Sequence, residues 1–539
     1  MSDRTLSDIQ FEDSFVRSLP GDASEKSNSR LVPNACYSLV KPTPVARPKI
    51  IGWSDELALS LGIIRSHEAD SDAAILAGNK LIPGMKPYAA RYGGHQFGNW
   101  AGQLGDGRAI TIGEFRGAAG QLMEMQLKGA GPTPYSRRAD GRAVLRSSLR
   151  EFLCSEAMFH LGVPTTRALS LTLTGDLVER DMLYDGNPDD EPGAVVCRIA
   201  PAFIRFGSFE ILAASNEQDN LRRLVDYTIE THFSRLGKPS AESYRQWFKV
   251  IAERTAEMIV HWMRVGFVHG VMNTDNMSVL GLTIDYGPYG WLEDYNPKWT
   301  PNTTDRGLRY CFGNQPQVAL WNIECLAGAL KPLFDETGIS DALDEGLQAY
   351  VNTFQSGYSE MLLKKLGVTP KDAGGDANLI ESAVAVLQAA EIDMTIFFRK
   401  LADLDLAGFS RLDDDKIESV IEPLKISYYD EKSFYGRQQT DLVTWLKVYA
   451  KHLDQHHPEL THATRRSHMN ACNPKYVLRN YMAQEAIDSA TTGDFSRIAL
   501  LQKVLRSPYD EQPDAEWLAV KRPDWARHKV GCSALSCSS

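Results

Sequence analysis

The sequence predicts an α+β fold with two lobes: a β-rich N-terminal lobe (N-lobe), a helical C-terminal lobe (C-lobe) and an additional helical region after them. From Gln121 to Lys128, apolar and polar residues alternate with the period of a half-buried strand. From Asn220 to Val265, apolar residues recur at spacings of three and four, as in amphipathic helices. Further helices are expected from about Lys331 to Pro508, so strands precede helices along the chain.

The length of 539 residues exceeds one ordinary hydrophobic core, because domains typically hold roughly 100 to 200 residues. We expect four parts. They are an N-terminal extension (1–84), an N-lobe with a glycine loop, a lysine strand and a glutamate helix (85–215), a C-lobe with the catalytic and metal loops (216–430), and a C-terminal helical region with a cysteine-containing tail (431–539).

Composition and charge narrow the functional class. Hydrophobic residues make up 43% of the chain, and no stretch approaches the ~18 to 20 apolar residues of a membrane span. The opening MSDRTLSDIQFEDSF lacks the apolar core of a secretory signal. A net charge of −11 gives no overall attraction to nucleic acid. We expect a cytoplasmic protein that is monomeric and has neither membrane nor nucleic-acid partners.

The cysteines predict neither a disulfide framework nor a structural zinc site, because eight cysteines are spread over a long chain without a CxxC pair. Cys532 and Cys537 lie in the tail VGCSALSCSS, where chains are usually accessible. Either a redox-sensitive thiol or an unreactive exposed cysteine fits this placement.

A glycine-rich segment follows Ala90, where seven glycines precede or interrupt a β-like stretch that runs from Arg108 to Phe115. Gly105 and Gly107 come just before Arg108, so the backbone could approach a phosphate closely while the guanidinium supplies positive charge. A plain hairpin turn is the alternative.

Lys128 ends the alternating strand, and a helix is expected from about Ala143 until Gly162. Glu151 lies beside the apolar stripe of this helix, where an unpaired carboxylate would be costly. Lys128 is its candidate partner, and kinase-type folds use such a pair to orient nucleotide phosphates. The alternative is a surface lysine and a solvated glutamate.

Arginines supply further candidate phosphate ligands. Arg138, Arg142, Arg146 and Arg150 recur every four residues and would form one basic face if the segment is helical throughout. This face adjoins Asp140 and Gly141 and is either solvated or partly directed at phosphate. Arg198 and Arg205 stand among apolar residues, a setting that favours bidentate anion recognition.

The stretch VHGVMNTDNMSVLGLTIDYG carries three oxygen ligands, Asp275, Asn276 and Asp285. We expect two short strands joined at Gly281, a hairpin that would bring Asn276 and Asp285 side by side. Mg²⁺ is usually held by one or two carboxylates together with substrate phosphates, so this set would suffice. The alternative is a polar hairpin with a surface aspartate.

The order of these parts is that of a protein-kinase-like fold. In kinases the loop reads His-Arg-Asp, four residues, then Asn. Counting back from Asn276 places His269 in the histidine position and Val271 in that of the catalytic aspartate. Valine cannot accept a proton, so the protein is either inactive or uses another base, and Asp275 is the nearest replacement.

At this point the sequence closely resembles the selenoprotein O family of kinase-like protein adenylyltransferases, from roughly Ala90 to the carboxyl terminus. The resemblance rests on the strings GHQFGNWAGQLGDGRA, LKGAGPTPYSRRADGRAVLRSSLREFL, VHGVMNTDNMSVLGLTIDYGPYG, EDYNP and MNACNPKYVLRNY, and on the near-terminal cysteine. It implies transfer of AMP from ATP to Ser, Thr or Tyr hydroxyls of proteins, including the enzyme itself. The nucleotide would be inverted relative to a kinase, so that its α-phosphate faces the acceptor.

The same resemblance implies a role for each site residue. Asp275 would accept the proton, and Asn276 and Asp285 would hold Mg²⁺, with Mn²⁺ as the alternative metal. Glu151 would orient Lys128. Cys537 would match the selenocysteine that many relatives carry. The residues expected to contact nucleotide are Gly105, Gly107, Arg108, Lys128, Asp140, Gly141, Arg198 and Arg205.

Two other functions stay open on the residues alone. One is a phosphotransferase that uses Asp275, and the other is an inactive kinase-like scaffold that binds nucleotide or partners. The presence of Lys128, Glu151, Asn276 and Asp285 weakens the scaffold hypothesis, because an inactive site has no need of the complete set.

Overall fold

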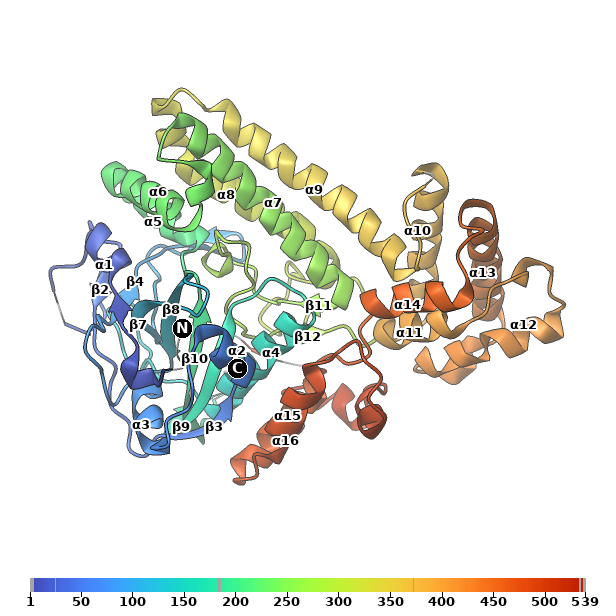
Figure 1. The fold of residues 1–539 in the computed structure, drawn as a ribbon, viewed down its shortest axis with the longest axis horizontal. Helices are drawn as coiled ribbons and strands as arrows, with labels where there is room; N and C mark the ends of the chain where they lie inside the picture. The colour runs from blue at the N-terminus through green and yellow to red at the C-terminus, as the bar shows by residue number, and fades with distance from the viewer. Residues whose placement is uncertain (1–3, 25, 182–185, 372, 533–534, 537–539) are drawn as a thin grey trace.

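The computed structural model describes residues 4–24, 26–181, 186–371, 373–532 and 535–536. Strands come first and gather at one end of the molecule, and long helices extend from them (Figure 1). The expected mixture of α and β structure is therefore present, with an antiparallel sheet.

The main sheet has the strand order β2-β4-β7-β8-β10-β9-β3, and β1 pairs with β7. Two further pairs, β5 with β6 and β11 with β12, lie outside it. The strands are β1 (Phe11–Glu12), β2 (Tyr37–Leu39), β3 (Lys49–Trp53), β4 (Tyr88–Ala90), β5 (His95–Gln96), β6 (Asn99–Trp100), β7 (Ala109–Arg116), β8 (Leu122–Lys128), β9 (Arg167–Arg180), β10 (Asp189–Ala200), β11 (Phe267–Val268) and β12 (Gly290–Trp291).

Residues 1–84, expected to form an N-terminal extension, contribute strands to the main sheet. Within this segment, strands β1, β2 and β3 pair with β7, β4 and β9 respectively. The N-terminal segment is therefore part of the sheet, and strands β2 and β3 form its two edges.

The helices follow the predicted order. They are α1 (Ser14–Ser18), α2 (Asp55–Leu61), α3 (Ala69–Leu76), α4 (Leu145–His160), α5 (Phe206–Ala214), α6 (Gln218–His232), α7 (Ala241–Val265), α8 (Gln315–Glu336), α9 (Asp341–Lys365), α10 (Ala373–Gln388), α11 (Met394–Asp403), α12 (Asp414–Ile421), α13 (Arg437–His456), α14 (His462–Cys472), α15 (Asn480–Thr491) and α16 (Ser496–Leu505). Among the described helices, none combines the length and apolar character needed to cross a bilayer.

Two hydrophobic clusters pack against opposite faces of the sheet. Strand β10 contributes to both, because its alternate residues point to opposite faces. Val196 belongs to the large cluster that includes α4 and the long helices. Val195 and Cys197 belong to a second cluster that includes residues of α2 and α3. The sheet is thus buried on both faces, and α4 is fixed against β9 and β10.

Helix α7 runs beside α8 and α9, and α10 and α14 pack against α9 farther from the sheet (Figure 1). Gly266 ends α7 in the left-handed conformation, with φ of 73°, as the glycine at that position predicts. The chain then turns directly into β11 and the loop that carries Asp275. Helices α15 and α16 return to pack against α4, so the C-terminal region contacts the sheet end of the molecule.

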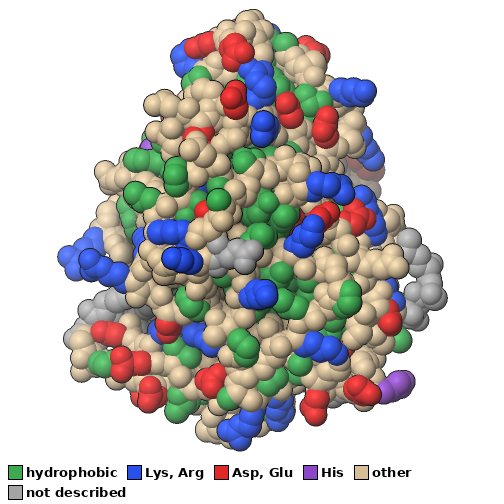
Figure 2. Space-filling view, turned by 90° about the vertical axis from the view of Figure 1, so that its left-hand side faces the viewer, with side chains coloured by type: hydrophobic (Ala, Val, Ile, Leu, Met, Phe, Trp, Pro, Cys, Tyr) green, Lys and Arg blue, Asp and Glu red, His purple; other side chains and the backbone are tan. Residues whose placement is uncertain are grey.

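On the face seen in Figure 2, Lys and Arg side chains are interspersed with acidic and apolar ones. A mixed surface of this kind offers no broad basic face to nucleic acid on that side.

Candidate active site

One cleft of about 730 Å³ collects the predicted site residues. It lies between the glycine-rich segment, the sheet and the loop that follows α7. The predicted residues that line it are Gly105, Gly107, Arg108, Lys128, Asp140, Gly141, Arg198, Arg205, Asp275, Asn276 and Asp285. Glu151 is the remaining predicted residue and lies behind Lys128.

The expected pairing of Lys128 with Glu151 is present. Lys128 ends β8, and its Nζ lies 2.6 Å from Glu151 Oε2 on α4. The other oxygen of Glu151 accepts a hydrogen bond of 3.1 Å from Arg198. Burial lowers the pKa of Lys128, although Glu151 and Asp285 oppose that shift. Glu151 therefore holds two cations at the back of the cleft.

Asp285 is fixed by three cations. Arg198 lies 2.5 Å from Oδ1, Lys128 lies 3.4 Å from the same oxygen, and Arg205 donates to Oδ2. Burial alone would raise the pKa of Asp285, but these cations hold it well below its usual value. Its backbone adopts φ of 60°, a left-handed conformation that is uncommon for residues other than glycine. The carboxylate is thus ionised and held in one position.

Asp275 has a different environment. It lies on the short 3₁₀ turn Thr274–Asn276 and is 8% exposed. Gln96 donates to its Oδ2 at 3.3 Å, whereas Oδ1 is buried and has no hydrogen-bond partner among the described residues. Burial raises the pKa of Asp275 to about 7, against the opposing charge of Arg205. This carboxylate can therefore take up and release a proton near neutral pH.

Asn276 projects from the same turn. Its Nδ2 donates to the carbonyl of Val271 at 2.9 Å, which orients the amide and leaves its carbonyl oxygen as an acceptor at the cleft. Asp275, Asn276 and Asp285 thus offer the oxygen donors that hard divalent cations prefer.

The predicted hairpin between Asn276 and Asp285 is wrong. Ser278 pairs through its backbone with Arg205, and Thr283 pairs with Thr165, so neither pairs with the other. A turn does form between them, because the Gly281 amide donates to Ser278. Asn276 and Asp285 still line one cleft, but distant segments of the chain hold them there.

The glycine loop lines the cleft. Gly105 adopts φ of 111°, and a Cβ there would lie 2.5 Å from the ring of Tyr135. Only glycine fits this approach without a shift of the neighbouring ring. Gly107 and Arg108 follow along the same edge of the cleft.

The arginine stripe does not form one basic face. Helix α4 begins at Leu145, so Arg138 and Arg142 lie in the preceding loop. Arg146 pairs with Glu191, and Arg150 is buried against Tyr289. A single basic face does not form, because the glycines and prolines after Lys128 prevent the helix from starting before the two loop arginines.

Asp140 and Gly141 lie in that loop at the rim of the cleft. Arg180 pairs with Asp140 at 2.7 Å, and the Arg142 amide donates to the same carboxylate. A Cβ at Gly141 would come within 2.2 Å of the Gly131 backbone, so the glycine lets two turns cross. Asp140 therefore orders the loop.

His269 and Val271 lie in the loop that leads to Asp275. His269 is buried and bonded at Nε2 to the carbonyl of Ile284, at 2.9 Å, while Nδ1 faces the Val271 amide at 3.3 Å. These partners assign the Nε2–H tautomer, and burial lowers the pKa of the ring. His269 thus links the two acidic segments, and Val271 presents an apolar surface to the cleft.

Sequence reasoning missed Asp106, Gln126 and Gln96. Asp106 is buried 3.6 Å from Arg205, and Gln126 contacts both Asp106 and Arg198. The period-two pattern of β8 places Gln126 on the same face as Lys128, so that signal was available. By contrast, 179 residues separate Gln96 from Asp275, and no local pattern links them.

The cysteine tail differs from the expectation of exposure where it is described. Cys532 is buried, its carbonyl accepts from Asn480, and burial raises its pKa to about 11. A thiol of this kind stays protonated at neutral pH and is a poor nucleophile. Cys537 lies outside the described residues.

Comparisons with known proteins cover nearly the whole chain. The family model described as Protein adenylyltransferase SelO matches residues 24–506. The Protein nucleotidyltransferase YdiU of Aromatoleum aromaticum is 55% identical over 544 residues, which cover 99% of this chain and 100% of that protein. The same-named protein of Nitrosospira multiformis is 52% identical, with 99% and 97% covered. That of Rhodopirellula baltica is 52% identical, with 99% of both chains covered.

Proposed function

The chain belongs to the SelO family of protein adenylyltransferases, and from this premise we propose that its cleft transfers AMP from ATP to Ser, Thr or Tyr hydroxyls of proteins, including its own. The observation that carries the proposal is Asp275, a buried carboxylate that lines the cleft while Val271 occupies the position of a kinase base.

We propose that the sheet end and the helices around α7 act as the two lobes of a protein-kinase-like fold. The support is the order of parts around the cleft. Lys128 ends a sheet strand, Glu151 pairs with it from α4, and the loop after α7 brings Asp275 to the opposite wall. The four-part division of the chain follows the same scheme, with the difference that 1–84 completes the sheet.

Cationic side chains in the cleft suit the phosphates of ATP. Arg198 and Arg205 are buried, yet the Nε atom of each has no hydrogen-bond partner among the described residues. Both residues also line the cleft, so their guanidinium groups lie where phosphate oxygens would bind. Arg108 and Lys128 add charge beside Gly105 and Gly107, where backbone can approach closely. In the proposed inverted pose, these groups hold the phosphates so that the α-phosphate faces Asp275.

In the proposed reaction the acceptor hydroxyl donates its proton to Asp275 as its oxygen attacks the α-phosphorus. A new O–P bond forms, the bond to the bridging oxygen breaks, and pyrophosphate leaves. General-base assistance of this kind is worth about 10²- to 10⁴-fold. Arg198, Arg205 and Lys128 stabilise the charge that develops on the phosphate oxygens. Gln96 and Asp275 both line the cleft, and the hydrogen bond from Gln96 to Oδ2 orients the carboxylate for the incoming hydroxyl.

Mg²⁺ fits the donor set of this cleft, and Mn²⁺ accepts the same oxygen ligands. Asn276 and Asp285 would hold the ion, since the Asn276 carbonyl oxygen is oriented by the bond to Val271 and Asp285 is ionised. When bound, the metal would neutralise phosphate charge. Arg198, Arg205 and Lys128 already surround Asp285, so we expect ATP phosphates to draw these cations away as the ion binds.

We also propose that the protein acts as a cytoplasmic monomer. Two observations support the cytoplasmic location. The cysteines of the described part are free thiols, as expected where thiols are kept reduced, and ATP is the co-substrate.

The test uses full-length protein with Mg²⁺ and ATP labelled at either the α- or the γ-phosphate. We expect protein-bound label from the α-position and none from the γ-position, with a much lower rate of labelling in Asp275→Asn. Label from the γ-position alone would show a phosphotransferase, and no label from either would leave a scaffold. Both results would overturn the proposal.

A further inference from the structure

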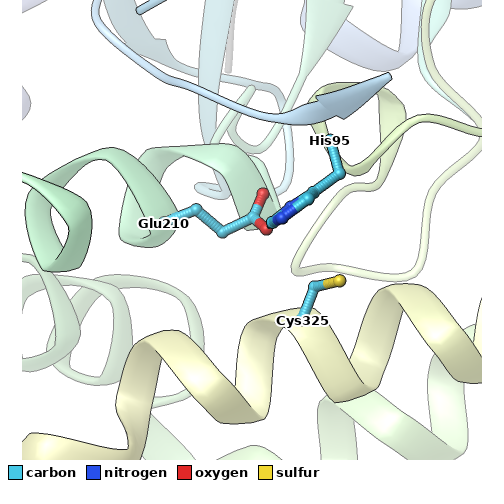
Figure 3. A group of neighbouring side chains, drawn as sticks. All are labelled: His95, Glu210 and Cys325. Carbon is cyan, nitrogen blue, oxygen red and sulfur yellow. The ribbon is translucent and has the colours of Figure 1, made fainter. Parts of the chain in front are cut away.

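A second group of ligand atoms lies beside the cleft, on three different elements. His95 comes from β5, Glu210 from α5 and Cys325 from α8, and their side chains project into one space (Figure 3). His95 Nδ1 lies 2.6 Å from Glu210 Oε1, and one ligand atom of each residue falls within 4.8 Å of the others. Within the described ranges, this is the one group of three His, Cys, Asp or Glu residues with that spacing.

Glu210 gives independent evidence of an unmet interaction. It is 4% exposed, and its Oε2 is buried without a hydrogen-bond partner among the described residues. Buried carboxylate oxygens normally have a partner, because burial of an unsatisfied polar atom is costly. Burial raises the pKa of Glu210, against the opposing effects of Thr274 and His95. A cation at this point would satisfy the free oxygen.

The ligand types select a transition metal ion over Mg²⁺. An imidazole, a carboxylate and a thiolate are the donors that tetrahedral Zn²⁺ uses, and three protein ligands leave a fourth position for water. Metal–ligand distances of about 2.0–2.3 Å place neighbouring ligand atoms about 3.3–3.8 Å apart. The His95–Glu210 contact therefore has to open by about 1 Å, and Cys325 has to move inward by at most about 1 Å. Rotation of these side chains can supply such movements.

A metal ion could reach this group from solvent, and the group lies next to the turn that carries Asp275. The His95 side chain is 27% exposed and Cys325 is half-buried, so an ion can reach the group from solvent. The His95 amide donates to Thr274 Oγ1, and the next residue, Gln96, contacts Asp275. Neither Asn276 nor Asp285 belongs to this group, which is therefore distinct from the magnesium ligands.

We propose that His95, Glu210 and Cys325 bind one Zn²⁺-type transition metal ion that fastens the β5–β6 hairpin to α5 and α8. Coordination uses the Nδ1 lone pair of neutral His95, the ionised Glu210 and the Cys325 thiolate, whose proton passes to solvent. The absence of a CxxC pair does not bear on this site, because its ligands come from distant parts of the chain. Through Thr274 and Gln96, the ion would stiffen the turn that carries Asp275.

Cobalt serves as the probe, because Co²⁺ bound to a thiolate absorbs in the near ultraviolet and tetrahedral Co²⁺ absorbs strongly in the visible range. Full-length protein is stripped of metal with a chelator and titrated with Co²⁺ in excess Mg²⁺. We expect both absorptions to saturate at one equivalent of Co²⁺ and to disappear when Zn²⁺ is added.

Variants assign the ligands. Cys325→Ser is expected to abolish the near-ultraviolet absorption, and Glu210→Gln to weaken Co²⁺ binding by about tenfold or more. The control is Cys472→Ser, which removes another half-buried thiol outside the group and should leave the spectrum unchanged. Circular dichroism verifies that each variant is folded. No thiolate absorption in the parent protein, or full absorption in Cys325→Ser together with unchanged affinity in Glu210→Gln, would overturn the proposal.

Discussion

Two buried ion clusters of the molecule differ in whether their polar atoms have partners. In the cleft, Asp275 Oδ1 and the Nε atoms of Arg198 and Arg205 have none within the part that the structure describes. In the second cluster, Arg479 lies between Glu293 and Asp393, 2.9 Å from Asp393, and Tyr429 closes the group. Among the described residues, no fully buried side-chain nitrogen or oxygen of these four residues lacks a partner.

The difference distinguishes a cluster that binds a ligand from one that stabilises the fold. Burial of ions is costly, and a closed cluster recovers that cost through mutual hydrogen bonds. Arg479 binds α15 to the segment after β12 and to the residue that caps α11, so its cluster joins distant parts of the helical region. The cleft cluster instead borders a cavity of about 730 Å³ and keeps polar atoms without partners. It is arranged to be completed by a ligand.

The largest expected effect comes from Asp275→Asn. Loss of the base should lower the rate of AMP transfer by about 10²- to 10⁴-fold. Stability should not fall, because the raised pKa of Asp275 means that the folded protein loses stability as pH rises from the unfolded value toward about 7. Removing the ionisable group removes that cost. The measurements are label transfer from α-labelled ATP and the thermal midpoint.

Asp72→Asn is the matched control, since Asp72 is also a buried carboxylate with a raised pKa and an oxygen that has no partner among the described residues, but it does not line the cleft. We expect its rate to remain within a few-fold of the parent protein. Equal losses in both variants would contradict a specific role of Asp275 as the base.

Arg479→Met is the converse change. It leaves Glu293 and Asp393 buried without their cation, which typically costs about 3–5 kcal/mol. We expect a lower denaturant midpoint, with the rate per folded molecule unchanged. Arg497→Met provides the control, because its pair with Glu485 is partly exposed and such pairs are worth about 0–1 kcal/mol. Similar midpoints for the two variants would contradict the supporting role of Arg479.

Local patterns in the sequence predicted those parts of the site that depend on one element at a time. Alternation placed Lys128 on a strand, and an apolar stripe placed Glu151 on a buried helix face, so their pairing could be inferred. The hairpin at Gly281 failed because Ser278 and Thr283 find backbone partners at Arg205 and Thr165. Such pairings join segments far apart in the chain, and periodicity carries no information about them.

The same limit explains the other differences. The regular spacing of Arg142 and Arg146 suggested one face, but the helix start at Leu145 separates them. Cys532 was expected to be accessible, yet contact with Asn480 buries it. Tertiary packing determines the burial of Cys532, and the composition of the tail does not predict that packing.

The pH dependence of AMP transfer shows whether Asp275 acts as a base with a pKa near neutrality. At low ATP concentration the initial rate reports kcat/KM, and hence the ionisation of the free enzyme. Because the ionised form accepts the proton, we expect the rate to rise about tenfold per pH unit below about 7 and to level off above it. The residual rate of Asp275→Asn, measured in the same buffers, shows the titration of ATP alone and should lack this step. A parent profile that is flat across neutral pH, or one that Asp275→Asn reproduces, would contradict the assignment of Asp275 as the base.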